Sequence, residues 1–151
     1  MIPDGSTADV ILDFGTGRYR FFLPLKAEVE VERLCGNVPL GVIYDEFSSS
    51  MGIDKGTENP VYLDGGQARR HYARHVIRVA AQYGGEAEID GEVVSVSSID
   101  ATRLVEQHVD GKHFSEVIPT AWMILKATLS GISLKKKGGA ADSIGASNEA
   151  S

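Results

Sequence analysis

The stretch Ser98–Gly131 constrains the fold most strongly, because it carries two amphipathic helical patterns joined by Asp110-Gly111. Apolar residues recur at helical spacing in residues 101–109, which predicts a helix with one buried face. Ser98 stands where its hydroxyl would cap the first turn. A second apolar series follows at the same spacing: Phe114, Ile118, Ala121, Trp122, Leu125 and Leu129. We expect two helices that pack across each other.

Pro119 and Gly131 bear on the limits of the second helix. Proline lacks the amide hydrogen that bonds one turn back, so we expect the regular helix to begin near Pro119 or to kink there. Gly131 is a typical residue for a helix C-terminus. Trp122 belongs to the apolar series, which favours a core anchor over an exposed binding hot spot.

The chain has 151 residues, of which 42% are hydrophobic and 24% charged, as is typical of one globular domain. A net charge of −6 disfavours nucleic acid as the main partner, because the phosphate backbone rewards a positive excess. Cys35 is the only cysteine, so an intramolecular disulfide is excluded and a reducing compartment is favoured. No secretory signal is seen, and no run approaches the roughly 18 apolar residues of a membrane span. We expect a cytoplasmic protein with no membrane partner.

The rest of the chain predicts an α+β fold. Two β-rich segments, 8–14 and 18–23, flank a short glycine-bearing link and predict an N-terminal β-hairpin. A second small hairpin is expected around Asp90-Gly91. Apolar periodicity predicts three further helices: Leu25–Cys35, Pro39–Ser49 with Asn37 as its cap, and Ala68–Tyr83.

We therefore expect a single α+β domain over residues 8–131, with the hairpin followed by about four to five helices. Residues 1–7 are expected to be flexible. Residues 48–66 are rich in Ser, Gly, Asp and Asn and predict a long loop with room for a short strand. Residues 132–151 carry a basic run and then a Gly/Ala/Ser-rich sequence, which predicts a disordered tail because it buries too little apolar surface to offset its ordering entropy.

The sequence contains no GxxxxGK(S/T) phosphate loop, no GxGxxG after a strand, no HExxH and no paired CxxC, so we expect no enzymatic activity and no cofactor. His71 and His75 lie four residues apart, but a zinc site needs a third ligand that the sequence does not place nearby. We expect no metal there, and keep a small ligand- or metal-binding domain as an alternative. Cys35 lies on the apolar side of its helix, which predicts a buried, inert thiol.

Arg70, Arg74 and Arg78 form one helical stripe within residues 65–85, a stretch without acidic residues. One interpretation is a solvated helix face paired with the acids of residues 25–35 or 87–92. The other is a docking surface for an acidic protein segment or, less readily, for nucleic acid. These three arginines and Trp122 are our candidate partner-binding residues.

The order of these features resembles the tail assembly chaperone-like proteins of gene transfer agents and related long-tailed phages or prophages. The opening hairpin leads into Leu25–Gly36, where Glu32 and Gly36 resemble the recurring acid and the terminating glycine of that family. Val76–Gly85 is similar to its middle helix, which ends in Gly-Gly.

Two further segments, residues 104–110 and 121–131, resemble the closing helix pair of the family. Together the similar features span residues 8–131. Two segments depart from the family pattern by their length, the loop at 48–66 and the hairpin at 86–97.

This resemblance implies a non-enzymatic role in virion tail morphogenesis. Copies of such a chaperone coat the apolar, helix-rich tape-measure protein, keep it soluble, recruit major tail-tube subunits, and leave before the particle is finished. Self-association is a further expectation. The alternative is a structural tail-tube or tail-terminus subunit that stays in the particle. Lys135-Lys136-Lys137 fits either an ordinary basic tail or a site of ribosomal frameshifting that yields an extended chaperone.

Overall fold

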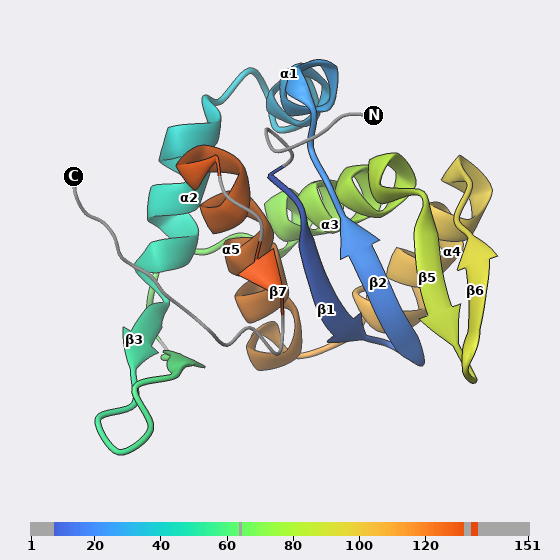
Figure 1. Ribbon diagram of the computed structural model, residues 1–151. Helices are drawn as coiled ribbons and strands as arrows, with labels where there is room; N and C mark the ends of the chain where they lie inside the picture. The colour runs from blue at the N-terminus through green and yellow to red at the C-terminus, as the bar shows by residue number, and fades with distance from the viewer. Residues whose placement is uncertain (1–7, 64, 132–133, 136–151) are drawn as a thin grey trace.

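The computed structural model describes residues 8–63, 65–131 and 134–135, which form an α+β fold (Figure 1). Within these residues there are five helices, a five-stranded sheet and a two-stranded sheet. The prediction of a flexible segment at 1–7 lies outside the described residues, as does the prediction of a disordered tail over 132–151 except at residues 134–135.

The larger sheet contains both predicted hairpins, in the strand order β6-β5-β2-β1-β7. Asp90 and Gly91 both have positive φ angles, 54° and 82°, as a two-residue hairpin turn requires. The strands of this sheet are β1 (Val10–Phe14), β2 (Gly17–Phe21), β5 (Glu86–Ile89), β6 (Glu92–Ser95) and β7 (Leu134–Lys135).

Strand β7 lies beyond residue 131, where we expected the domain to end. It pairs in parallel with β1, with Leu134 opposite Val10 and Lys135 opposite Ile11. The described fold therefore continues into the segment expected to be a tail, and β7 places it at the opposite end of the sheet from β6.

The predicted long loop at residues 48–66 contains a second, smaller sheet. Its strands β3 (Met51–Ile53) and β4 (Pro60–Tyr62) are antiparallel. At the tip, Asp54 Oδ1 accepts a hydrogen bond of 3.0 Å from Gly56 N. A hairpin arm thus projects from the domain between α2 and α3 of the chain (Figure 1).

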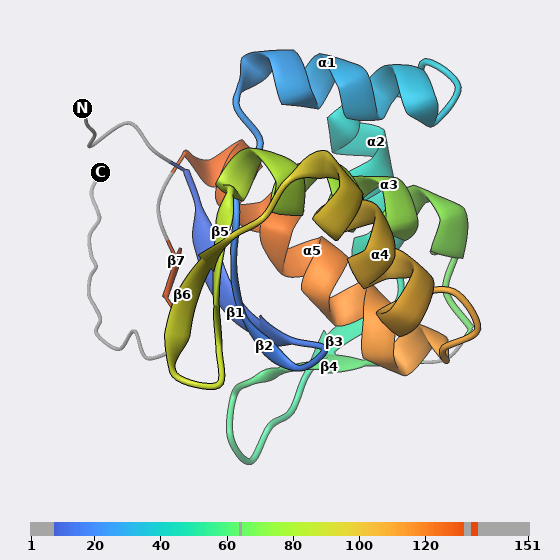
Figure 2. The same ribbon diagram turned by 90° about the vertical axis from the view of Figure 1, so that its right-hand side faces the viewer.

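The helices cover one face of the larger sheet, and the core lies between the two layers. Figure 2 shows α3, α4 and α5 stacked on the same side of this sheet, with α1 at one end. Buried side chains from both layers meet there, among them Phe21, Ile77 and Leu125. The helices are α1 (Leu25–Leu34), α2 (Leu40–Ser48), α3 (Arg70–Gly84), α4 (Ser98–His108) and α5 (Phe114–Ser130).

Helix α3 is the centre of the helical layer. We expected α4 and α5 to pack across each other, and this was wrong, since α3 is the principal helical neighbour of both. The reason lies in its sequence, because small residues at Ala73, Ala80 and Ala81 allow close packing on more than one side. Helix α3 also contacts α1 and β2.

The two glycines at the end of α3 have different roles. A Cβ atom at Gly84 would overlap the carbonyl oxygen of Arg20 in β2, so only glycine permits this contact between helix and sheet. Gly85 has a φ angle of 76° and caps the helix in the left-handed conformation. Two hydrogen bonds seal the junction, Phe22 N to Ala80 O at 3.0 Å and Arg20 Nη1 to Gly84 O at 2.9 Å.

Glu32 and Gly36 join α1 to α2. Gly36 has a φ angle of 84°, and the amide of Asn37 donates to Glu32 O at 2.8 Å, which closes the helix in a Schellman turn. The Glu32 carboxylate then accepts a 2.9 Å hydrogen bond from Leu40 N at the start of α2. Asn37 makes no side-chain cap, contrary to our prediction; Pro39 is the cap residue and Glu32 supplies the acceptor.

The starts of α4 and α5 also differ from prediction. Ser97, not Ser98, caps α4: its hydroxyl accepts from Asp100 N at 3.2 Å while Asp100 Oδ2 accepts from Ser97 N at 3.0 Å. This reciprocal capping box uses an aspartate where glutamate is more usual. Of the two alternatives for α5, a start near Pro119 is wrong: the helix begins at Phe114 and contains Pro119, and His113 Nδ1 caps it by accepting a hydrogen bond of 3.0 Å from Ser115 N.

Candidate functional site

The arginine stripe on α3 is largely used inside the fold. Arg74 donates from Nε and Nη2 to the two carboxylate oxygens of Asp110, at 2.8 and 3.1 Å. The guanidinium of Arg70 lies 4.7 Å from the ring centre of Phe114, in cation–π geometry. Arg74 therefore ties α3 to the segment between α4 and α5, and Arg70 contacts the first residue of α5. Their partners are not the acids of residues 25–35 or 87–92 that we considered.

Arg78 is half-buried, one turn beyond Arg74 on the same helix. His75 lies beside it, and the pKa of His75 is lowered first by burial and then by the positive charges of Arg78, His71 and Arg74. The imidazole of His75 is thus driven towards its neutral form and adds little charge to the stripe. Within the described residues, no group of three or more metal-binding side chains occurs.

Trp122 is an anchor between α5 and α2, as its place in the apolar series predicted. Its side chain is buried, and its indole Nε1 donates to Ser48 Oγ at 3.0 Å. The ring of Tyr44 lies nearly parallel to the indole, with the ring centres 6.2 Å apart. Trp122 is consequently committed to the core and does not present its indole to a partner in this conformation.

An apolar surface that sequence reasoning missed lies at the free edge of the larger sheet. All four residues of β6 are exposed, and the exposed fractions of Val93 and Val94 are 72% and 37%. Ile99, in the first turn of α4, is 67% exposed. We call Glu92–Ser95 together with Ile99 the edge-strand surface. Strand β6 pairs with β5 on one side, and no described strand pairs with its other side.

On the outer face of the sheet, away from the helices, side chains of alternating charge form a row across the strands that ends at the edge-strand surface. Asp13 and Arg18 form an ion pair of 3.2 Å, and Arg18 stands opposite Glu88 on β5. Glu88 in turn stands opposite Val93 on β6. The charged row therefore ends on an exposed valine at the edge of the sheet.

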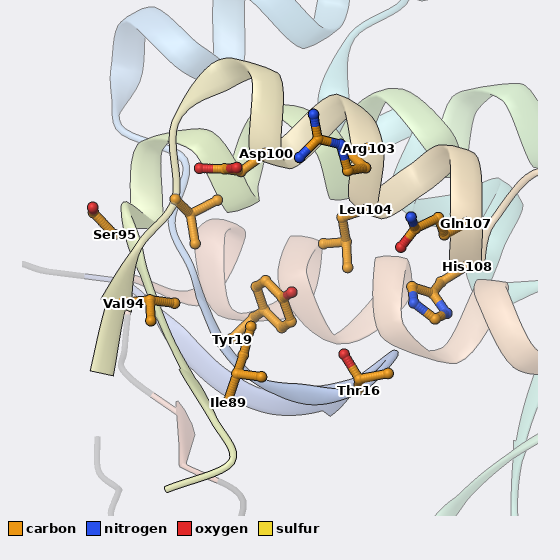
Figure 3. Close-up of a pocket in the computed structure, with 11 residues that line it drawn as sticks. Thr16, Tyr19, Ile89, Val94, Ser95, Asp100, Arg103, Leu104, Gln107 and His108 are labelled. Carbon is orange, nitrogen blue, oxygen red and sulfur yellow. The ribbon is translucent and has the colours of Figure 1, made fainter. Parts of the chain in front are cut away.

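A groove of about 320 Å³ runs between α4 and the strands beside this edge (Figure 3). In Figure 3 the ring of Tyr19 reaches from β2 towards α4, and Leu104 and His108 face it from the helix. Burial, followed by the charge of Asp100, raises the pKa of the Tyr19 hydroxyl, so it stays protonated and can donate a hydrogen bond. The groove lining is mixed: Ile89, Val94 and Leu104 are apolar, and Asp100, Arg103 and Gln107 are polar.

Two smaller hollows adjoin the same corner of the domain. One, of about 240 Å³, lies on the outer face of the sheet and reaches Val93. The other, of about 230 Å³, lies along the exposed side of α4 and is lined in part by Ile99 and Arg103. The edge-strand surface is thus bordered by three concavities that combine apolar and charged side chains. Such a combination suits the binding of a protein segment better than that of a compact small molecule.

The sequence contains a signal for this surface. Strand residues alternate between the two faces of a sheet, so Val93 and Val94 cannot both face the helices. The first consequently lies on the outer face, and the second faces the groove at its rim. The two adjacent valines thus place one apolar side chain on each face of the sheet, and the strand order puts both at its edge.

No helix in the described parts of the chain has the length and apolar character needed to cross a membrane. Comparison of the chain with family models, with curated proteins and with solved structures gives no significant match.

Proposed function

We propose that this chain is a tail assembly chaperone-like protein of a gene transfer agent or related long-tailed phage. In this role it binds the tape-measure protein, keeps that apolar helical client soluble, and helps to recruit tail-tube subunits. The observation that carries the proposal is the edge-strand surface, an exposed apolar border beside three concavities, where β5 is the only described strand that pairs with β6. No catalytic step is required of the protein.

The chemistry of this surface suits reversible binding of an apolar client. Val93, Val94 and Ile99 supply apolar area, while Glu92 and Arg103 at the rim remain hydrated and limit non-specific association. The outer edge of β6 adds backbone donors and acceptors, which bind extended, non-helical segments of the client without regard to their side chains. A chaperone that must release its client during tube assembly needs such moderate, sequence-tolerant contacts.

The ordered features behind the resemblance have structural roles that support the proposal. Glu32 and Gly36 shape the turn between α1 and α2, and Gly84-Gly85 lets α3 meet β2. They preserve the scaffold and do not touch the edge-strand surface. The family pattern would then specify the domain, with the client-binding residues lying outside it.

Co-expression with the neighbouring tape-measure protein, followed by size-exclusion chromatography, tests the proposal. We expect soluble co-elution with the wild-type chain and its loss in a Val93→Lys/Ile99→Lys variant. Ile53→Lys is the matched control, because Ile53 is similarly exposed but lies on the distant β3–β4 arm. An insoluble client with the wild-type chain present would contradict the chaperone function. Equal loss in the control would show that the edge-strand surface is not the binding site.

The open edge also favours a second candidate, a tail-tube or tail-terminus subunit that pairs edge to edge with its neighbours and stays in the particle. A protein census of finished particles separates the two. A chaperone is absent from them, whereas a structural subunit is present at a fixed copy number.

A further inference from the structure

We propose that two copies of this chain associate through antiparallel pairing of β6 with β6 about a two-fold axis, with Val94 opposite Val94 of the second copy. The proposal does not depend on the chaperone function, because it concerns the isolated protein. It rests on the backbone of the free edge, on the faces of the β6 side chains and on the distribution of charge around them.

The direction of the free backbone groups follows from the β5–β6 ladder. Val96 N donates to Gly85 O at 2.9 Å, and Glu86 stands opposite Ser95. Bonded and non-bonded residues alternate along an antiparallel strand, so Val94 and Glu92 also point their amides and carbonyls towards β5. Those of Val93 and Ser95 therefore point away from the sheet, where a partner strand would lie.

Val93 and Ser95 determine the register of the β6–β6 pair. In a two-fold pair the hydrogen-bonding residues of one copy must face those of the other, and each face of the sheet must continue across the junction. Placing Val93 opposite Ser95 of the second copy meets both conditions and uses all the free groups of both residues. Val94 then meets its own counterpart on the groove side.

Charge favours this arrangement. Glu92, the one ionisable residue of β6, falls opposite Val96 in the second copy, so no like charges face each other across the pair. Val96 directly precedes the cap of α4, and a helix N-terminus favours a nearby carboxylate. Asp100 opposes this attraction at the same helix end, but its carboxylate is already engaged with Ser97, and Arg103 lies one turn further along.

The interface is small. A strand of four residues buries less than the roughly 800 Å² per partner of a stable complex, so we expect a reversible, concentration-dependent dimer. Joining the two edges would create one continuous ten-stranded sheet from two copies of the five-stranded one. It would also occupy the backbone edge of β6 that the proposed client would use.

Sedimentation equilibrium of the isolated chain over a wide concentration range is the first test. We expect a monomer–dimer equilibrium that Ser95→Pro weakens at least about tenfold, since proline removes an amide that points to the partner. The bonds to β5 are unaffected by this change, because Ser95 does not hydrogen-bond to β5 in the alternation above. Far-ultraviolet circular dichroism and Trp122 fluorescence verify that the variant is folded.

Disulfide trapping tests the register. Opposed residues in a non-bonded antiparallel pair have Cα atoms about 4.5 Å apart, within disulfide range. We expect Val94→Cys to cross-link readily under mild oxidation, whereas Val93→Cys, which faces Ser95, and the distant Ile53→Cys do not. The native Cys35 does not interfere because it is buried.

A strictly monomeric wild-type chain, or a dimer unaffected by Ser95→Pro, would overturn the proposal, as would cross-linking of Ile53→Cys at the rate of Val94→Cys. None of these results would bear on binding of the tape-measure protein. Conversely, failure of the client to co-elute would leave the dimer proposal standing.

Discussion

The carbonyl oxygen of Arg20 occupies the space where a side chain at position 84 would begin, so α3 can meet β2 only through Gly84. We expect Gly84→Ala to lower the free energy of unfolding by about 1–3 kcal/mol, the usual cost of overpacking. Chemical denaturation followed by Trp122 fluorescence measures it. Gly41→Ala is the control, since nothing lies within 4 Å of a Cβ at Gly41 in α2. An equal effect at both positions would contradict the contact.

Substitution of two adjacent serines tests which residue caps α4. Ser97→Ala removes the hydroxyl that accepts from Asp100 N and should cost about 1 kcal/mol of stability. Ser98→Ala, at the position that the sequence pattern suggested as the cap, should be nearly neutral. Thermal unfolding of the two variants decides between them, and a larger loss at Ser98 would restore the original assignment.

The capping box at the start of α4 also predicts that the stability of the fold depends on pH. Hydrogen bonds from the backbone and the hydroxyl of Ser97 lower the pKa of Asp100 below its ordinary value of 3.8. The folded state thus prefers the carboxylate, so this contribution to stability is complete above pH 3.8 and is lost as the pH falls through the lower, folded pKa. In Ser97→Ala the pKa of Asp100 should rise, which carboxyl titration by NMR measures. The backbone amide of residue 97 still donates in this variant, so an unchanged pKa would mean that the Ser97 hydroxyl does not stabilise the carboxylate.

Charge reversal should change the stability of the fold by different amounts at Arg74 and at Arg78. Arg74→Glu breaks the bidentate pair with Asp110 and brings like charges together, so we expect a loss of about 1 kcal/mol that shrinks at high salt. Arg78→Glu should leave stability nearly unchanged. The two melting temperatures at low and high ionic strength provide the comparison. A loss of client binding in folded Arg78→Glu would support the stripe as part of the docking surface.

The Cys35 thiol should be inert in the native state. Burial, followed by the nearby charge of Glu46, raises its pKa to about 11. At pH 8 we expect labelling by a thiol reagent to be at least about a hundredfold slower than in the unfolded chain, because little thiolate is present. Rapid labelling of the native protein would show that α1 opens or that the thiol is exposed.

The local parts of this fold follow from the sequence. Helical periodicity identifies all five helices, and a glycine-bearing link or Asp90-Gly91 identifies the two hairpins of the larger sheet. The predictions of helix caps were wrong where a second residue could supply the same hydrogen-bond acceptor. Ser97 and Ser98 are both competent caps, and Glu32 replaces Asn37 as the acceptor at α2 because the Schellman turn brings its carboxylate there.

The long-range arrangement does not follow from such patterns. Nothing in the sequence around Arg74 indicates that its partner is Asp110, because the pairing depends on where α4 ends relative to α3. The hairpin pattern around Asp90-Gly91 likewise does not determine whether β5 or β6 pairs with β2. The choice of β5 leaves Val93 at the free edge. The candidate site therefore emerged only from the strand order.

The central position of α3, between α1, α4, α5 and β2, has a consequence for how the domain opens. Releasing α3 would remove the support of nearly every other element, so its amides should exchange with solvent deuterium only through global unfolding. The β3–β4 arm and the β6 edge make fewer such contacts and can open locally while α3 stays protected. The domain thus combines a cooperative centre with a border that can rearrange at little thermodynamic cost.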